Sequence, residues 1–150
     1  MSSNESILDI NPDTFAEMSR HAESAFPYEC CGFFYGREEN KRRIVTHALA
    51  IENSNTENPE RRFDITPRQY REAEEFADNH DLLLLGVYHS HPGHPAIASK
   101  HDLKVALPWF SYLIFSVQDG KTADAKSWRL TDSKQFEEET VETEIKYYQQ

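Results

Sequence analysis

The chain has 150 residues, which suits a single domain with a buried core. Hydrophobic residues make up 38% of it, and no apolar run is long enough to cross a membrane. The formal net charge of −10 would repel the phosphates of a nucleic acid. The only two cysteines, Cys30 and Cys31, are adjacent, which excludes a disulfide framework. We therefore expect a cytoplasmic protein, made without a signal peptide, that has neither a membrane nor a nucleic-acid partner.

The first half of the chain predicts a helix, a hairpin and a second helix. An asparagine and a proline suit the start of a helix over 12–25. The apolar runs 29–36 and 43–51 are typical of two antiparallel strands. Residues 52–65 are polar and predict a long loop, and loops of this length are often functional. The capping box Thr-Pro-Arg-Gln then opens a helix over 67–80.

The second half predicts strands interrupted by one short helix. The apolar run 82–88 indicates a buried strand, and Ser-Lys-His-Asp at 99–102 opens the short helix. Two further strands, 109–117 and 125–130, are joined by a turn that contains Asp-Gly. Residues 136–145 are ambiguous, because an apolar pair four apart suits a helix whereas the Glu/Thr alternation suits an edge strand. We favour the edge strand.

This order of elements predicts an α/β fold, in which a mixed central sheet carries helices packed on it. We expect one domain over 1–150, with flexible flanks at 1–10 and 146–150. The sequence leaves the oligomeric state open.

Two histidines follow the strand predicted at 82–88 and suggest a metal site. Residues two apart in an extended chain point to one face and lie about 6–7 Å apart, so His89 and His91 could reach the same ion. The next helix begins near Asp102, which brings a carboxylate back to the strand end. Catalytic zinc sites have three protein ligands and leave a fourth position for water. A histidine on a strand is, however, more often structural than a metal ligand. Ser99-x-x-Asp102 is also an ordinary capping box at a helix start. The cap and the ligand roles of Asp102 can coexist.

Five residues together resemble the signature of the JAMM (MPN+) zinc metalloproteases: Glu29, His89, His91, Ser99 and Asp102. The glutamate precedes a Cys-Cys-Gly strand start, as in the stand-alone prokaryotic members of that family. The resemblance covers about residues 15–145, although it is specific only around the five residues. One local departure is Ala98, where related proteins often have proline before the serine.

The resemblance implies a role for each residue of the signature. His89, His91 and Asp102 would bind one Zn²⁺ per chain. Glu29 would act as general base and then as general acid, and Ser99 would hydrogen-bond the zinc-bound water or the developing oxyanion. The reaction implied is hydrolysis of a peptide or isopeptide bond without an acyl-enzyme, so the two cysteines are expected to be core residues.

The resemblance also implies a class of substrate. Stand-alone prokaryotic proteins of this kind process ubiquitin-like sulfur carriers and cut after a C-terminal Gly-Gly. An extended tail could add as a strand to an exposed sheet edge, and residues 52–65 are a candidate clamp for it. His94 and His101 are extra to the signature and are expected at the surface rather than as further ligands, although His94 could stand in the substrate channel.

Three other functions share parts of this pattern. A DNA-repair-associated protein of the RadC kind has a similar His-x-His-Pro and Ser-x-x-Asp arrangement, although the acidic charge opposes it. A non-catalytic MPN scaffold would have lost ligands that this chain retains. A zinc deaminase would need His-x-Glu and Pro-Cys-x-x-Cys elements, which the sequence lacks.

Overall fold

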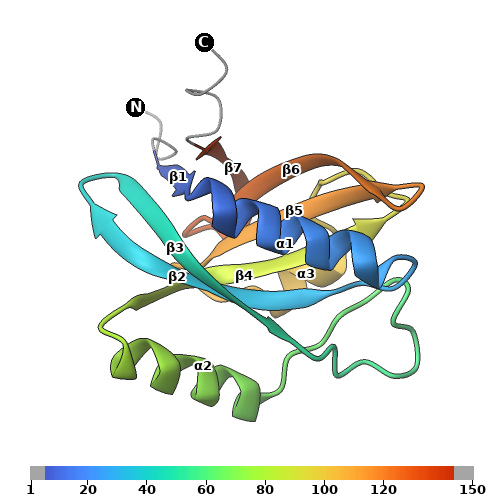
Figure 1. Ribbon diagram of the computed structural model, residues 1–150, viewed down its shortest axis with the longest axis horizontal. Coiled ribbons are helices and arrows are strands. Elements are labelled where there is room, and N and C mark those ends of the chain that lie inside the picture. The colour runs from blue at the N-terminus through green and yellow to red at the C-terminus, as the bar shows by residue number, and fades with distance from the viewer. Residues whose placement is uncertain (1–5, 144–150) are drawn as a thin grey trace.

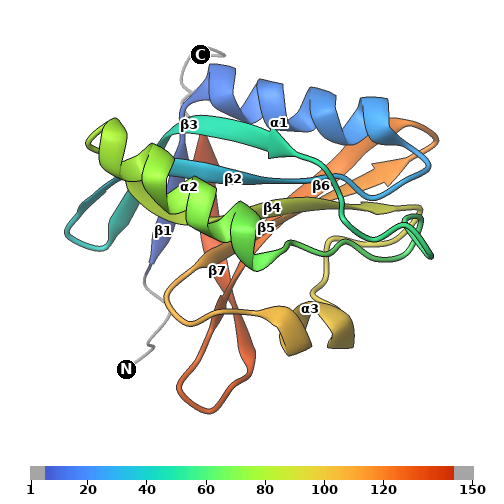
Figure 2. The same ribbon diagram turned by 90° about the horizontal axis from the view of Figure 1, so that it is seen from below.

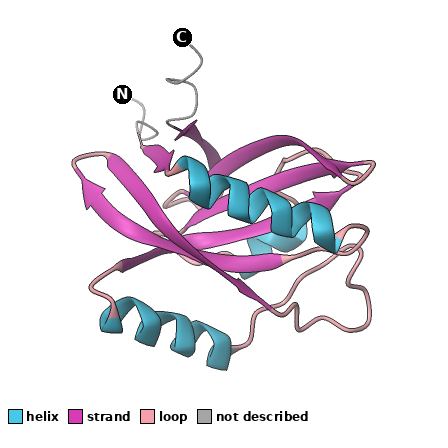
Figure 3. Ribbon diagram, in the orientation of Figure 1, coloured by secondary structure: helices cyan, strands magenta, loops and turns pink. Residues whose placement is uncertain are grey.

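A computed structural model describes residues 6–143, which form one mixed α/β domain (Figures 1 and 3). Its strands form a single sheet in the order β1-β3-β2-β4-β5-β6-β7, which closes into a barrel. Within the described residues no helix is both long and apolar enough to pass through a membrane. The elements in chain order are β1 (Ile7–Ile10), α1 (Pro12–Ala25), β2 (Cys31–Glu39), β3 (Arg42–Ile51), α2 (Pro67–Asn79), β4 (Leu83–Pro92), α3 (Lys100–Val105), β5 (Ser111–Gln118), β6 (Lys121–Leu130) and β7 (Phe136–Thr143).

The helices begin where the local sequence predicts them. The side chain of Asn11 accepts hydrogen bonds from the two backbone N–H groups at the start of α1. Thr66 and Gln69 form the predicted capping box of α2, and each side chain bonds to the backbone of the other. The predicted β2–β3 hairpin and the polar loop over 52–65 are likewise present.

The closure of the sheet was not predicted. The strand that closes it lies within residues 1–10, and the prediction that these residues are flexible is wrong for 7–10. These residues form β1, whose Leu8 and Ile10 are fully buried. β1 pairs in parallel with both β3 and β7 and thereby joins the two ends of the sheet. A strand of four residues has too little periodicity to stand out in a sequence. The predicted flank at 146–150 lies outside the described residues.

The C-terminal strand β7 also differs from its prediction. The strand is present, but it does not lie at an edge, since it pairs with β6 on one side and with β1 on the other. One of its glutamates is in the interior of the fold: Glu139 is fully buried and accepts a hydrogen bond of 2.7 Å from the Ser127 hydroxyl.

Two apolar clusters pack on the two faces of the sheet. The first joins α1 to side chains from all seven strands, including Leu8, Phe34 and Phe115. The second joins α2 to β2, β4 and β5, and it also includes Phe63 from the long loop. Figure 2 shows α1 and α2 on different sides of β2 and β3. Both helices therefore hold the central strands in place. The start of α3 lies near the end of β4, where Asp102 contacts His91.

Strand directions decide where the candidate site lies. β2 runs antiparallel to β4, and Cys31 at the start of β2 is the register partner of His89 near the end of β4. Residues that directly precede β2 must therefore lie beside the last residues of β4. This places Glu29 at the histidine pair, although sixty residues separate them along the chain.

Candidate metal and catalytic site

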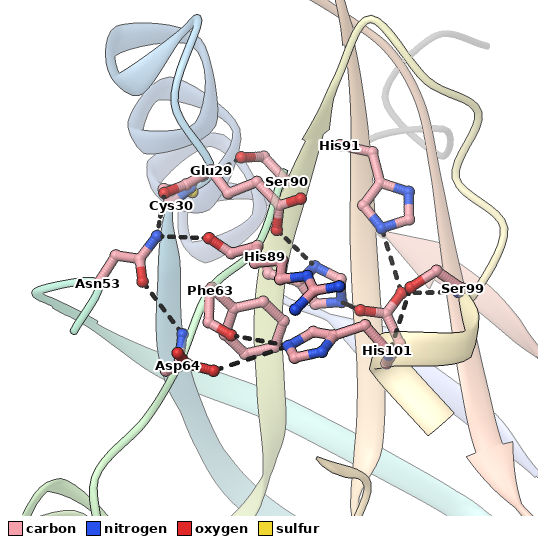
Figure 4. Close-up of polar contacts among 12 residues, drawn as sticks. Glu29, Cys30, Asn53, Phe63, Asp64, His89, Ser90, His91, Ser99 and His101 are labelled. Atoms are coloured by element: carbon pink, nitrogen blue, oxygen red, sulfur yellow. Dashed lines mark hydrogen bonds and ion pairs between the residues drawn. The ribbon is translucent and has the colours of Figure 1, made fainter. Parts of the chain in front are cut away.

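The five residues of the predicted signature come from three segments that meet at the end of β4, and Figure 4 labels all of them except Asp102. Glu29 precedes β2, both histidines lie on β4, and Ser99 and Asp102 open α3. Glu29, the histidines and Asp102 are buried, each with 7% or less of its surface exposed, whereas Ser99 is exposed.

His89, His91 and Asp102 form a compact group that could hold a metal ion. One ligand atom from each lies within 4.8 Å of the other two. The imidazole rings are on one face of β4, as predicted, with centroids 5.1 Å apart. Asp102 lies between them, its two carboxylate oxygens 3.7 Å from His89 Nε2 and 3.2 Å from His91 Nε2. Two nitrogens and one carboxylate oxygen form the donor set of many catalytic zinc sites.

His91 is held in the tautomer that a metal ligand requires. Its Nδ1–H donates to the Pro95 carbonyl at 2.8 Å, which leaves Nε2 directed at the metal group. Burial opposes protonation of His91, but the hydrogen bonds to Asp102 and to the Pro95 carbonyl outweigh it and raise its pKa. Asp102 is also buried, yet the neighbouring His89 and His91 and the N–H of Ser99 lower its pKa.

His89 provides the strongest indication that the group binds a cation. The residue is fully buried, and neither ring nitrogen has a hydrogen-bond partner among the described residues. Leaving buried polar atoms unpaired costs about 1–3 kcal/mol each, so an unexplained pair requires a reason. Burial lowers the pKa of His89 to about 4, which keeps the ring neutral as a metal ligand must be. A metal at Nε2 would satisfy the atom that faces Asp102.

Glu29 faces the other side of the same imidazole. Its Oε1 lies 3.8 Å from His89 Nδ1. Burial raises the pKa of the Glu29 carboxyl to about 8; the charge on His91 opposes this shift and that on Asp102 adds to it. A carboxyl group with a pKa near neutrality can both accept and release a proton at working pH.

The loop over 52–65 fixes the backbone of Glu29 from both sides. The Glu29 N–H donates to the Pro59 carbonyl at 2.7 Å, and the Glu29 carbonyl accepts from Asn53 Nδ2 at 3.2 Å. The Asn53 side chain also binds the Arg62 carbonyl and accepts from the N–H of Asp64. One amide side chain thus joins both ends of the loop to the segment that carries Glu29, a role that the sequence did not reveal.

Three further residues hold the histidines and α3 in position. Phe63 stacks on His89, with ring centroids 4.3 Å apart. Ser90, between the two histidines, points to the opposite face and accepts the Cys30 N–H at 2.9 Å, which ties the end of β4 to the start of β2. His101 was expected at the surface but is only partly exposed, and its Nε2 lies 3.4 Å from the Phe63 carbonyl. His94 is exposed, as expected.

The cap and ligand roles of the Ser99–Asp102 pair are compatible. The Asp102 N–H donates to Ser99 Oγ at 3.1 Å, and the Ser99 N–H donates to Asp102 Oδ2 at 2.8 Å. Because Ser99 Oγ acts here as an acceptor, its own proton is free to be donated to a bound molecule.

A pocket of about 530 Å³ opens onto this site. The residues that line it come from the segment before β2, the long loop and the β4–α3 connection: Glu29, Arg61, His91, His94, Pro95, Ile97 and Ser99. Cys30 and Cys31, in contrast, are buried and unpaired core residues, as predicted. Burial raises the pKa of the Cys30 thiol to about 12, so it is not a nucleophile.

Several known proteins are similar to this chain over most of its length. The sequence profile described as prokaryotic homologs of the JAB domain matches residues 11–131. The desampylase of Pyrococcus furiosus is 28% identical over 137 residues, which cover 90% of each chain. The CysO-cysteine peptidase of Mycobacterium tuberculosis is 27% identical over 133 residues, or 88% of each chain.

Solved structures agree with the sequence comparison. A protein of Desulfitobacterium hafniense has a TM-score of 0.79 and 29% identity, with 91% of this chain and 92% of that chain covered. A protein of Salinibacter ruber has a TM-score of 0.70 and 33% identity, with 90% of each chain covered.

We expect Asn53→Ala to lower the free energy of unfolding by about 1–3 kcal/mol, because it leaves several loop groups without partners. Urea denaturation would measure the loss. Asn79→Ala, at the exposed end of α2, is the control and should change stability by less than about 0.5 kcal/mol. Equal effects of the two substitutions would contradict the role assigned to Asn53.

The raised pKa of Glu29 predicts a pH-dependent stability in metal-free protein. The pKa of its carboxyl rises from 4.5 to about 8 in the folded state, so folding takes up a proton between these values. The resulting stabilisation is complete below pH 4.5 and is lost as the pH rises through 8. Glu29→Gln cannot titrate, so wild-type stability relative to this variant should fall by about 3.5 kcal/mol from pH 5 to pH 8. Urea denaturation in chelator would test this, and a constant difference would contradict it.

Proposed function

The chain belongs to the family of prokaryotic JAB-domain proteins, and on this basis we propose that it is a zinc-dependent peptidase or isopeptidase that cuts after the C-terminal Gly-Gly of a ubiquitin-like or sulfur-carrier protein. It is a hydrolase of the JAMM type. The observation that carries the proposal is the position of a buried carboxyl group of raised pKa, Glu29, against the ring of His89, which also faces Asp102.

In the proposed mechanism His89, His91 and Asp102 hold the zinc. When bound, zinc supplies a Lewis acid that polarises the scissile carbonyl and makes water a better nucleophile at neutral pH. Glu29 accepts a proton from the attacking water as its oxygen forms a bond to the carbonyl carbon. The same carboxyl group then delivers a proton to the leaving amine as the C–N bond breaks.

Ser99 would stabilise the charge that develops on the carbonyl oxygen. Its Oγ already accepts the Asp102 N–H, which orients the hydroxyl proton away from α3. Removal of such a donor in other hydrolases costs about 10²–10³ in rate. The products are a free carboxylate on the Gly-Gly tail and a free amine.

The names of the relatives support the substrate class. A desampylase and a CysO-cysteine peptidase both cover about nine-tenths of this chain. The fold also offers a place for an extended tail, since residues 47–51 of β3 pair with β2 only, beyond the reach of β1. A groove of about 330 Å³ lies between α2 and strands β2 and β3, and residues 49–51 of the open edge line part of it. We propose that the tail adds there as a strand, with the loop over 52–65 guiding it to the site.

The other candidate functions have less support. A non-catalytic scaffold would not need a base beside an intact ligand group. A RadC-like role with DNA would have to overcome the net charge of −10.

The central experiment is cleavage of a small ubiquitin-like carrier that has extra residues after its Gly-Gly, followed by mass spectrometry. Wild-type protein with zinc should release the extension, and chelator should stop the reaction. Glu29→Gln should keep the fold and the metal but lose at least about 10²-fold in rate, because the proton shuttle is absent. Glu74→Gln, on the exposed face of α2, is the control. Full activity of Glu29→Gln would assign the base elsewhere.

A second test concerns the metal ligands. We expect His91→Ala to lose bound zinc and activity together, whereas His80→Ala, at the exposed end of α2, should lose neither. Elemental analysis of the purified proteins would give the zinc content per chain. One equivalent of zinc retained by His91→Ala would overturn the ligand assignment.

A further inference from the structure

The pocket at the candidate site has one cationic side chain whose role the proposed mechanism does not explain. Arg61 lines this pocket together with Glu29 and Ser99. It lies in a turn of the long loop that is fixed by the Asn58 carbonyl, which accepts the N–H groups of Arg61 and Arg62. The guanidinium is therefore presented from an ordered backbone.

The guanidinium of Arg61 has no partner among the residues that the structure describes. Within residues 6–143 it makes neither an ion pair nor a hydrogen bond, although acidic residues outnumber basic ones by 26 to 16 in the whole chain. Arg42, Arg43 and Arg129, in contrast, each contact a carboxylate. Glu29 is the only acidic residue that lines the pocket. An anionic ligand would thus meet an unused guanidinium there and a single carboxyl group.

The chemistry of the leaving group indicates what that anion is. The leaving amine must lie within reach of Glu29, which lines the same pocket as Arg61. If the leaving group is a single amino acid, its carboxylate carbon is only about 2.5 Å from the amine nitrogen. A lysine side chain released from an isopeptide bond, in contrast, brings no carboxylate near its amine. Pro95 and the exposed Ile97 supply an apolar wall for a leaving side chain.

We propose that Arg61 forms a subsite for the free α-carboxylate of a residue that directly follows the Gly-Gly, and that this side chain sets a preference for a carrier ending in a free acid over an amide or an isopeptide conjugate. This rests on the proposed function. Arginine binds carboxylates through two parallel N–H···O bonds, so the subsite would select a C-terminal acid over an amide or an internal peptide bond.

The experiment compares carriers that are identical up to the Gly-Gly. One ends in alanine with a free carboxylate, one in alanine amide, and one is joined to the side chain of a lysine. Wild-type protein should prefer the acid over the amide by about 10- to 100-fold in kcat/KM, mainly through KM, as expected for a hydrogen-bonded charge pair.

Variants assign the preference to one side chain. Arg61→Gln should lower kcat/KM for the acid to the value for the amide and so abolish the preference, and Arg61→Lys should restore part of it. Arg62→Gln is the matched control, since Arg62 is an exposed neighbour that does not line the pocket. Equal cleavage of acid and amide by wild-type protein, or a preference retained in Arg61→Gln, would overturn the proposal.

A binding measurement separates this proposal from the proposed function. If no carrier is cleaved, the proposed function fails. Calorimetry with zinc-loaded Glu29→Gln would then compare the affinities for the acid and the amide. Tighter binding of the acid, lost in the double variant Glu29→Gln/Arg61→Gln, supports the subsite. Equal affinities for the acid and the amide overturn it.

Discussion

The antiparallel pairing of β2 with β4 is the constraint on which the site depends. Because Cys31 is opposite His89, the start of one strand and the end of the other occupy the same edge of the sheet. The Ser90 hydroxyl reinforces this register through the N–H of Cys30, on the face opposite the histidines. A slip of one residue would turn His89 and His91 to the other face and separate them from Asp102. The base and the ligand group are therefore held together by backbone pairing in the core.

The long loop over 52–65 holds Glu29 and His89 in position once the strands have brought them together. Its ends are joined by Asn53, its middle supplies the carbonyl that binds the Glu29 N–H, and Phe63 covers one face of His89. These contacts keep water away from the carboxyl group and the ring, and the resulting burial moves the pKa of Glu29 up and that of His89 down. Loops of this length in compact domains are uncommon unless they have such a role.

Local sequence signals predicted more of this structure than long-range contacts did. Helix starts and the spacing of the histidine pair follow from a few adjacent residues, and both are present as expected. The position of Glu29 depended on a resemblance to a family, because the chain has 26 acidic residues and none is marked by its neighbours. The closure by β1 and the role of Asn53 depend on pairing and loop conformation across distant segments, which periodicity does not report.

The capping box of α3 has a thermodynamic consequence. A helix of six residues is too short to persist by itself, so α3 depends on the contacts at its first turn. Asp102 belongs both to that turn and to the group suited to a cation. Occupancy by a cation and winding of α3 are then linked equilibria: the ion favours the wound helix, and unwinding withdraws a ligand and weakens the hold on the ion.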